Sequence, residues 1–255
     1  MGLSLKEIEM KLKSNEDMEE CILLLKNDGR KGAQRLLQTF KRRQEKERQL
    51  ENMHRQMTVY EQKLLENGSN MIAGIDEVGR GPLAGPVVAC AVILPADFKL
   101  LGLTDSKKLS KAKREAFADH IKKEAVSYSI SMVHAVEIDQ MNIYQSTKKA
   151  MCQAIEKLQY EPDHLLVDAM TLPVVTNQTS IIKGDQKSIS IAASSVLAKV
   201  ARDRYMEELE SQYPGYGFAN HAGYGTKEHL EALEILGVTK EHRQSFKPII
   251  DLLAT

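Results

Sequence analysis

The spacing of apolar residues divides the chain into two parts that meet near residue 70. Before that point, apolar side chains recur every three or four residues among Lys, Glu and Gln, which is typical of amphipathic helices. A turn is predicted at Asn27-Asp28-Gly29, and a long helix over 31–66 that the polar residues 67–70 terminate. The pattern predicts a helical N-terminal extension over residues 1–70.

After residue 70, short strand-like runs alternate with helical ones. Strands are predicted over 71–76, 86–94, 126–134, 165–168 and 179–183. Helices are predicted over 110–124, with Ser110 as N-cap, and over 143–159, 188–212, 226–236 and 239–246. This order predicts an α/β domain over 71–255, with a mixed sheet flanked by helices on both faces and a helical C-terminal part.

Composition excludes several classes of protein. The 255 residues are 42% hydrophobic and 27% charged, as in ordinary globular proteins, and Lys+Arg and Asp+Glu are both 35. No apolar run approaches the ~20 residues that span a bilayer, so no membrane association is expected. The cysteines Cys21, Cys90 and Cys152 are too far apart to indicate a zinc site or a disulfide framework. We expect a cytoplasmic protein.

The octet at residues 74–81 reads Gly-Ile-Asp-Glu-Val-Gly-Arg-Gly and combines an apolar strand with two adjacent carboxylates. An unpaired buried carboxylate is costly, so we expect the strand to end at Asp76 and Glu77, which would hold a hard cation. The glycines allow backbone N–H groups to approach an anionic ligand. The octet therefore indicates metal-assisted chemistry on a phosphodiester.

Two further carboxylates, Asp168 and Asp185, follow apolar runs in the same way. Ligand sites of open α/β sheets lie beyond the carboxyl ends of the strands, so these side chains are candidates for the same site. Four hard oxygen donors suit Mg²⁺ or Mn²⁺, and two such ions can activate a water and stabilise a leaving oxygen. A single Asp at a strand end often only caps a turn, and the spacing alone leaves that alternative open.

The octet and several later motifs together resemble the type 2 ribonucleases H, the bacterial ribonuclease HII family. The further motifs are Leu83-Ala84-Gly85-Pro86, Asp105-Ser106-Lys107-Lys108-Leu109, Val167-Asp168, Lys183-Gly184-Asp185, residues 192–203 and residues 221–226. The resemblance covers about 71–250 and leaves 1–70 outside it. It implies a ribonuclease H-like fold and a monomeric endonuclease that cuts the RNA strand of RNA–DNA hybrids. It also implies incision 5′ of ribonucleotides embedded in duplex DNA, leaving 3′-hydroxyl and 5′-phosphate ends.

The resemblance also implies roles for individual residues. The implied catalytic and metal-binding set is Asp76, Glu77, Asp168 and Asp185. The implied substrate-binding set is Gly79, Arg80 and Gly81 at the ribose 2′-hydroxyl, Tyr224 at the RNA-to-DNA step, and Lys107 and Lys108 at phosphates. Without the resemblance, a glycine turn with a solvated arginine, a packed loop tyrosine and solvated lysines would be the favoured explanation of these residues. His221 could assist the leaving group or only stabilise a turn.

The extension and two rival functions remain open at this stage. Residues 31–55 carry eight Lys/Arg against three Glu, which fits nucleic-acid binding or a solvated helix, and Leu36, Leu37 and Phe40 could instead dock a protein. One rival function is a junction-resolving nuclease of the same fold, which needs no reader of the 2′-hydroxyl. The other is a catalytically silent hybrid-binding module with structural Mg²⁺.

Overall fold

A computed structural model describes residues 3–14 and 16–254. Internal contacts divide the chain into two units, Met1–Met53 and His54–Thr255, and each is described by itself. Helix α4 (Val59–Glu66) therefore falls into the second unit, although the sequence pattern placed it in the extension. The predicted domain boundary between residues 70 and 71 stays a prediction.

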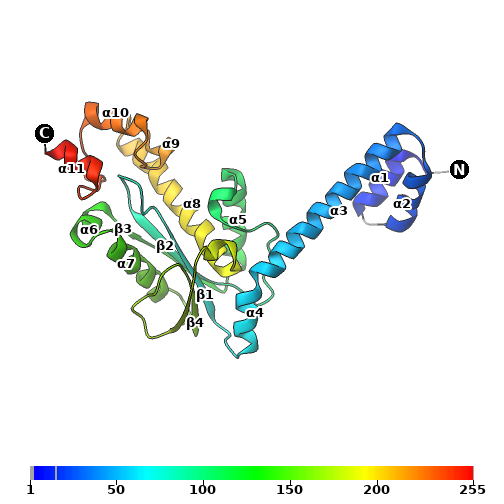
Figure 1. The fold of residues 1–255 in the computed structure, drawn as a ribbon, viewed down its shortest axis with the longest axis horizontal. Helices are drawn as coiled ribbons and strands as arrows, with labels where there is room; N and C mark the ends of the chain where they lie inside the picture. Colours follow the sequence, from blue (N-terminus) through cyan, green and yellow to red (C-terminus); the bar gives the residue numbers. More distant parts are fainter. Residues whose placement is uncertain (1–2, 15, 255) are drawn as a thin grey trace. The chain divides into compact units, whose positions relative to one another are not determined.

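The first unit is a small helical assembly with a core of its own. It contains α1 (Leu5–Ser14), α2 (Met18–Asn27) and the first part of α3 (Lys31–Met57) (Figure 1). The helices bury one set of side chains together, namely Ile8, Leu12, Cys21, Leu25, Ala33 and Phe40. Leu36 and Leu37 pack against this cluster, so the apolar residues considered for docking mainly build the unit itself. The helix predicted over 31–66 is interrupted at Thr58.

The second unit is built on a five-stranded mixed sheet with the order β3-β2-β1-β4-β5 (Figure 1). The strands are β1 (Ile72–Val78), β2 (Val87–Ile93), β3 (Ser127–Val133), β4 (His164–Asp168) and β5 (Asn177–Ile181). The first three pair antiparallel, and β4 and β5 join them in parallel. The five predicted strands are confirmed, with bounds that shift by one or two residues.

Helices cover both faces of this sheet, as predicted (Figure 1). On one face, α8 (Ile189–Gln212) packs along β1, and α5 (Lys111–Glu124) packs against α8. On the other face lie α6 (Ala135–Met141), which the pattern did not predict, and α7 (Ile143–Glu156). Helix α8 is buried over most of its first half because it fills the space between the sheet and other helices.

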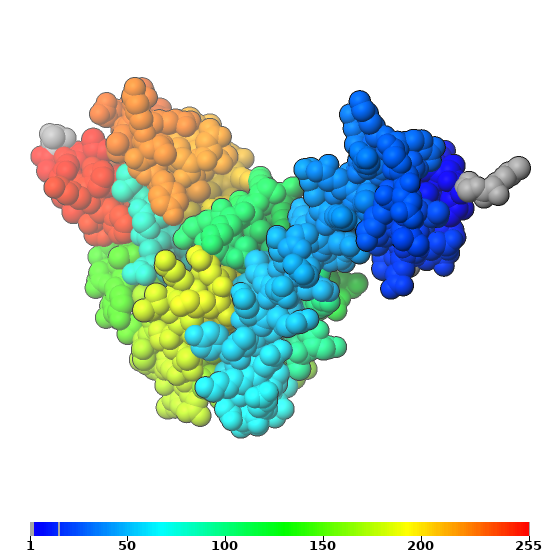
Figure 2. Space-filling view, turned by 45° about the vertical axis from the view of Figure 1, so that its right-hand side comes forward, coloured from blue at the N-terminus to red at the C-terminus, as the bar shows by residue number. Residues whose placement is uncertain are grey.

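The C-terminal part consists of short helices that lie together, orange to red in Figure 2. These are α9 (Phe218–His221), α10 (Lys227–Leu236) and α11 (Lys247–Leu253). The helix predicted over 239–246 is wrong, because the segment is irregular there. Arg243 in this segment is completely buried and donates hydrogen bonds to three backbone carbonyls. The spacing of apolar residues along the chain does not predict such contacts.

Buried imidazoles make the C-terminal part sensitive to acid. His229 and His242 face each other with their Nε2 atoms 3.1 Å apart. Burial lowers the pKa of His242 to about 4, with His229 adding to the effect, and burial also lowers the pKa of His229. Both rings are therefore neutral in the folded protein at pH 7. Their contribution to stability is complete above the unfolded pKa of ~6.5 and is lost as the pH falls below it, for His242 towards a pH of about 4.

We therefore expect His242→Gln to change how stability depends on pH. Urea unfolding between pH 7.5 and 4.5 should show a free energy of unfolding that falls less steeply below pH 6.5 in the variant than in the unsubstituted protein. Equal slopes in the two proteins would contradict the assignment of acid sensitivity to these histidines.

Candidate active site

Two adjacent strands bring the predicted carboxylates to one end of the sheet. Asp76 and Glu77 lie in β1, and Asp168 is the last residue of the parallel neighbour β4. Asp185 lies in the short 3₁₀ helix η2 (Gly184–Gln186) that follows β5. The expectation that β1 ends at the carboxylates is wrong, because β1 continues to Val78 while its last two residues become half-buried.

The four carboxylates open into one pocket of about 240 Å³. Most of the predicted substrate-binding residues line it with them. The complete lining is Asp76, Glu77, Val78, Gly79, Arg80, Gly81, Ser106, Lys107, Asp168, Asp185, Ser195 and Tyr224. Lys108 is exposed and does not line this pocket, so of the two predicted lysines only Lys107 borders the carboxylates.

Local hydrogen bonds fix two of the carboxylates. Asp76 Oδ1 accepts from the backbone N–H of Glu77 at 2.7 Å, and Asp168 Oδ1 accepts from the backbone N–H of Gly184 at 2.6 Å. Arg80 Nη1 lies 3.5 Å from Glu77 Oε1. Each of these contacts leaves a further carboxylate oxygen for a ligand.

The carboxylates are crowded, and their pKa values reflect it. Burial raises the pKa of Asp76 well above its ordinary value, and the charges of Glu77 and Asp168 add to this. Burial also raises the pKa of Glu77, an effect that Arg80 partly offsets, and that of Asp168, which the Gly184 N–H opposes. The pKa of Asp185 rises to about 6 through burial and the nearby Asp105 and Asp168. The pocket thus holds more negative charge than its own cations neutralise.

The donor set fits a hard divalent cation. Carboxylate oxygens are the ligands that Mg²⁺ and Mn²⁺ prefer, and a cation would offset the burial and the mutual repulsion that raise these pKa values. Within residues 3–14 and 16–254, no three His, Cys, Asp or Glu side chains are already grouped closely enough to hold an ion.

Three polar residues at or beside the site, Asp105, Ser106 and Ser195, were not predicted as functional. Asp105 is 8% exposed, and its Oδ1 accepts from the backbone N–H of Lys107 at the start of the 3₁₀ helix η1 (Ser106–Lys108). Ser195 of α8 lines the pocket, and its Oγ lies 3.0 Å from that of Ser106. All three lie in motifs that the sequence displayed, but nothing in their spacing separated them from structural residues.

The turn after β1 is held from behind by two buried arginines. Gly79 has a φ of +92°, and a Cβ atom there would lie 2.2 Å from Arg202 Nε. Arg202 donates to the carbonyls of Pro86, Ala84 and Ala222. Arg243 donates to the carbonyls of Gly79, Arg80 and Gly85 at 2.6–3.0 Å. These bonds turn the carbonyls inward and leave the Arg80 side chain exposed.

Removing the guanidinium at position 243 should destabilise this turn strongly. Arg243→Met leaves three carbonyl groups without that donor, and each unsatisfied buried carbonyl costs about 1–3 kcal/mol. We expect the free energy of unfolding in urea to fall by roughly 3 kcal/mol or more. Arg204→Met, at an exposed arginine of α8, is the matched control and should change it by less than about 0.5 kcal/mol. A similar, small change in both variants would refute this role of Arg243.

The second wall of the pocket carries Tyr224. Its ring lies 3.5 Å from the position of a Cβ atom on Gly81, so the glycine turn and the tyrosine are neighbours. The tyrosine is 45% exposed and accessible to a ligand. His221 instead bonds the Tyr216 carbonyl through Nε2 and the Gly223 N–H through Nδ1, which favours the turn-stabilising alternative.

The sheet order and the carboxylates at the ends of its central strands define a nuclease of the ribonuclease H-like class. Among solved structures, ribonuclease H2 from Pyrococcus horikoshii OT3 matches with a TM-score of 0.62 and 26% identity, over 71% of this chain and 96% of that one. The family model described as "Ribonuclease HII" matches residues 73–249, and "Ribonuclease HII N-terminal domain" matches residues 4–65.

Curated relatives cover nearly the whole chain. The ribonuclease HII of Shouchella clausii is 60% identical over 93% of this chain and 90% of its own. That of Halalkalibacterium halodurans is 54% identical over 99% and 97%. The chain belongs to the ribonuclease HII family and is an endoribonuclease of the ribonuclease H type, a metal-binding phosphodiester hydrolase.

No helix among the described residues is long and apolar enough to cross a bilayer.

Proposed function

We propose that the protein cuts the RNA strand of RNA–DNA hybrids and incises 5′ of ribonucleotides embedded in duplex DNA, with Asp76, Glu77, Asp168 and Asp185 as the ligands of divalent ions. The observation that carries this proposal is the single pocket that all four carboxylates line. When bound, Mg²⁺ or Mn²⁺, in a pair during catalysis, activates the attacking water and stabilises the leaving 3′-oxygen. The products then carry 3′-hydroxyl and 5′-phosphate ends.

The chain's own residues position the substrate around that pocket. The Gly79–Gly81 turn lacks side-chain bulk at both ends, so its backbone can approach the ribose 2′-hydroxyl. The exposed ring of Tyr224 stacks on the sugar or base that follows the ribonucleotide. Lys107 contacts a phosphate beside the carboxylates, and Lys108 contacts the duplex further out.

A panel of three substrates tests this proposal. We expect cleavage of an RNA–DNA hybrid and of a duplex with one embedded ribonucleotide when Mg²⁺ or Mn²⁺ is present, and none with chelator. An all-DNA four-way junction should stay intact under the same conditions. Cleavage of the junction, or failure to cut beside ribonucleotides, would refute the proposed substrate.

The basic face of α3 is proposed to add affinity for nucleic acid. Lys41, Arg42 and Lys46 are exposed there and line one shallow groove. If they contact phosphates, the triple Gln variant should bind a hybrid more weakly and show a salt slope smaller by about 2–3, since each contact contributes roughly 0.9. A Lys6→Gln/Lys26→Gln variant is the control. An unchanged slope in the triple variant leaves α3 as a solvated helix.

The proposed setting of the enzyme is the cytoplasm, where it acts as a monomer. Its three cysteines, Cys21, Cys90 and Cys152, are all free thiols. Free thiols are typical of proteins in a reducing compartment.

A further inference from the structure

Helix α4 precedes the catalytic strands in sequence but is built into their core. Tyr60, Leu64 and Leu65 of α4 pack on a cluster of four residues from three strands and α8, namely Ile72, Leu166, Ile181 and Ile191. In Figure 2 the cyan α4 lies directly beside the yellow-green segment that contains β5 and the start of α8. The helix thus contacts the part of the fold that carries Asp185.

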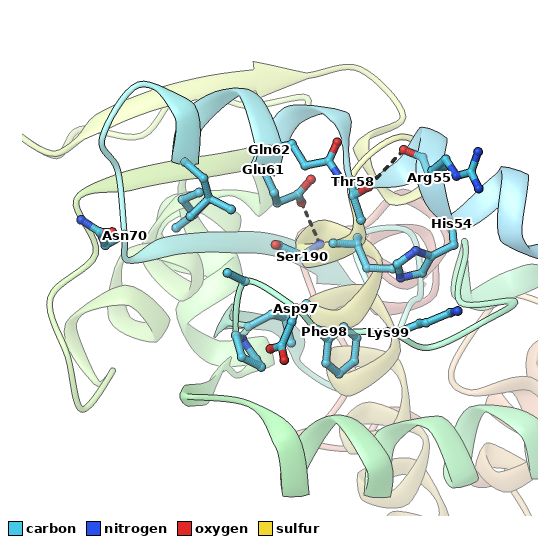
Figure 3. Close-up of a pocket in the computed structure, with 16 residues that line it drawn as sticks. His54, Arg55, Thr58, Glu61, Gln62, Asn70, Asp97, Phe98, Lys99 and Ser190 are labelled. Atoms are coloured by element: carbon cyan, nitrogen blue, oxygen red, sulfur yellow. Dashed lines mark hydrogen bonds between the residues drawn. The ribbon is translucent and has the colours of Figure 1, made fainter.

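The same face of α4 inserts a carboxylate into this contact. Glu61 is only 8% exposed, and its side chain points to the first turn of α8 (Figure 3). Glu61 Oε1 accepts from Ser188 Oγ at 2.5 Å and from the backbone N–H of Ser190 at 3.0 Å. Ser188 is the N-cap of α8, and its Oγ also accepts from the Ile191 N–H. A carboxylate here satisfies a free N–H group and complements the helix dipole.

A short series of hydrogen bonds connects this carboxylate to the catalytic pocket. The backbone N–H of Ser188 donates to the Gly184 carbonyl at 2.8 Å, which closes a tight turn around Asp185. The N–H of Gly184 donates in turn to Asp168 Oδ1. The turn that Glu61 holds therefore carries Asp185 and orients Asp168.

The other oxygen of Glu61 is not needed for this connection. Glu61 is one of the residues that line a cavity of about 250 Å³. Its Oε2 atom is buried, and no donor from the described residues reaches it. An amide at position 61 would therefore keep both bonds through its oxygen, whereas an apolar side chain would lose both.

We propose that Glu61 is a positioning residue, which from helix α4 holds the turn 184–188 and so sets Asp168 and Asp185 for ion binding. The inference rests on the proposed metal role of these two aspartates. It assigns the segment before the catalytic strands a part in building the active site. Ligand-orienting partners of metal sites typically contribute 10–100-fold to affinity or activity, which sets the scale of the effect.

Direct Mn²⁺ titration of the full-length protein without substrate tests this role, with free Mn²⁺ followed by electron paramagnetic resonance. We expect Glu61→Leu to weaken Mn²⁺ binding by about 10-fold or more, while Glu61→Gln stays within about 3-fold. Glu66→Leu, on the exposed face of α4, is the matched control and should bind normally. In the hydrolysis assay, Glu61→Leu should lower kcat and raise the Mn²⁺ requirement with little change in KM for the hybrid.

Two further variants separate the possible failures. Asp185→Asn should itself weaken Mn²⁺ binding, and if it does not, the metal role of Asp185 fails rather than that of Glu61. Ser188→Ala removes the hydroxyl link to Glu61 together with the N-cap bond to the Ile191 N–H, and keeps the bond from the Ser190 N–H to Glu61. It should weaken binding in the same direction as Glu61→Leu, so it replaces that variant should Glu61→Leu not fold. Normal Mn²⁺ binding in Ser188→Ala and in a folded Glu61→Leu, with weak binding in Asp185→Asn, would overturn the positioning role.

Discussion

Asp76→Asn should abolish most hydrolysis while making the metal-free protein more stable. Loss of a direct ion ligand should reduce kcat by more than the ~10–100-fold typical of outer-shell changes. The asparagine keeps the shape of the side chain, and its amide oxygen can still accept from the Glu77 N–H. Single-turnover kinetics on a hybrid measures the loss. Asp119→Asn, at an exposed site on α5, is the control and should keep full activity.

The expected gain in stability of the metal-free Asp76→Asn variant follows from the direction in which the pKa of Asp76 is shifted. Burial and the neighbouring carboxylates raise the pKa of Asp76, so the folded state binds a proton more tightly than the unfolded chain. The unfavourable contribution of Asp76 to the free energy of unfolding is therefore absent at low pH. It grows as the pH rises above the ordinary pKa of an aspartate, near 4. In chelator at pH 7.5, Asp76→Asn should raise the Tm. A lower Tm together with full turnover would contradict both its burial among like charges and its role as an ion ligand.

Gly74→Ala should unfold or severely destabilise the second unit. A Cβ atom at position 74 would lie 2.1 Å from the carbonyl carbon of Ser190 and 2.5 Å from the nitrogen of Ile191. Both are backbone atoms of α8, so no side-chain rotation relieves the overlap. Overpacking usually costs about 1–3 kcal/mol, and here we expect the upper end or more because β1 and α8 must separate.

The measurement is urea unfolding with Gly29→Ala as the control. A Cβ atom on Gly29 meets no atom within 4 Å, so that variant should unfold near the midpoint of the unsubstituted protein. A Gly74→Ala protein with an unchanged midpoint would show that α8 does not lie as close to β1 as described.

Elements with a strong local pattern were predictable from the sequence. Alternation and apolar runs located all five strands, and Ser110 marked the start of α5, where its Oγ accepts from the Lys113 N–H. Most residues that line the pocket were also predictable, because strand-end carboxylates and the resemblance to one family pointed to the same positions, whereas Ser106 and Ser195 were not predicted.

Features that depend on contacts between distant segments were not predictable. The glycines of the octet were interpreted as making room for an anionic ligand, whereas the structure requires Gly74 for the close approach of α8. Segment 239–246 carries a helical pattern, but Arg243 must reach the carbonyls of the turn after β1. Glu61 was one charge among many in a polar helix, and only its bonds to Ser188 and Ser190 distinguish it.

The central claim is that the four carboxylates bind the catalytic ions, and diffraction from crystals soaked in Mn²⁺ tests it most directly. Anomalous difference maps should show Mn²⁺ in the pocket, with oxygens of Asp76 and at least one of Glu77, Asp168 and Asp185 about 2.1 Å away. The same maps from Asp76→Asn crystals should lose or weaken that peak. Mn²⁺ bound only elsewhere, or a pocket that stays empty at saturating Mn²⁺ with hybrid bound, would contradict the account.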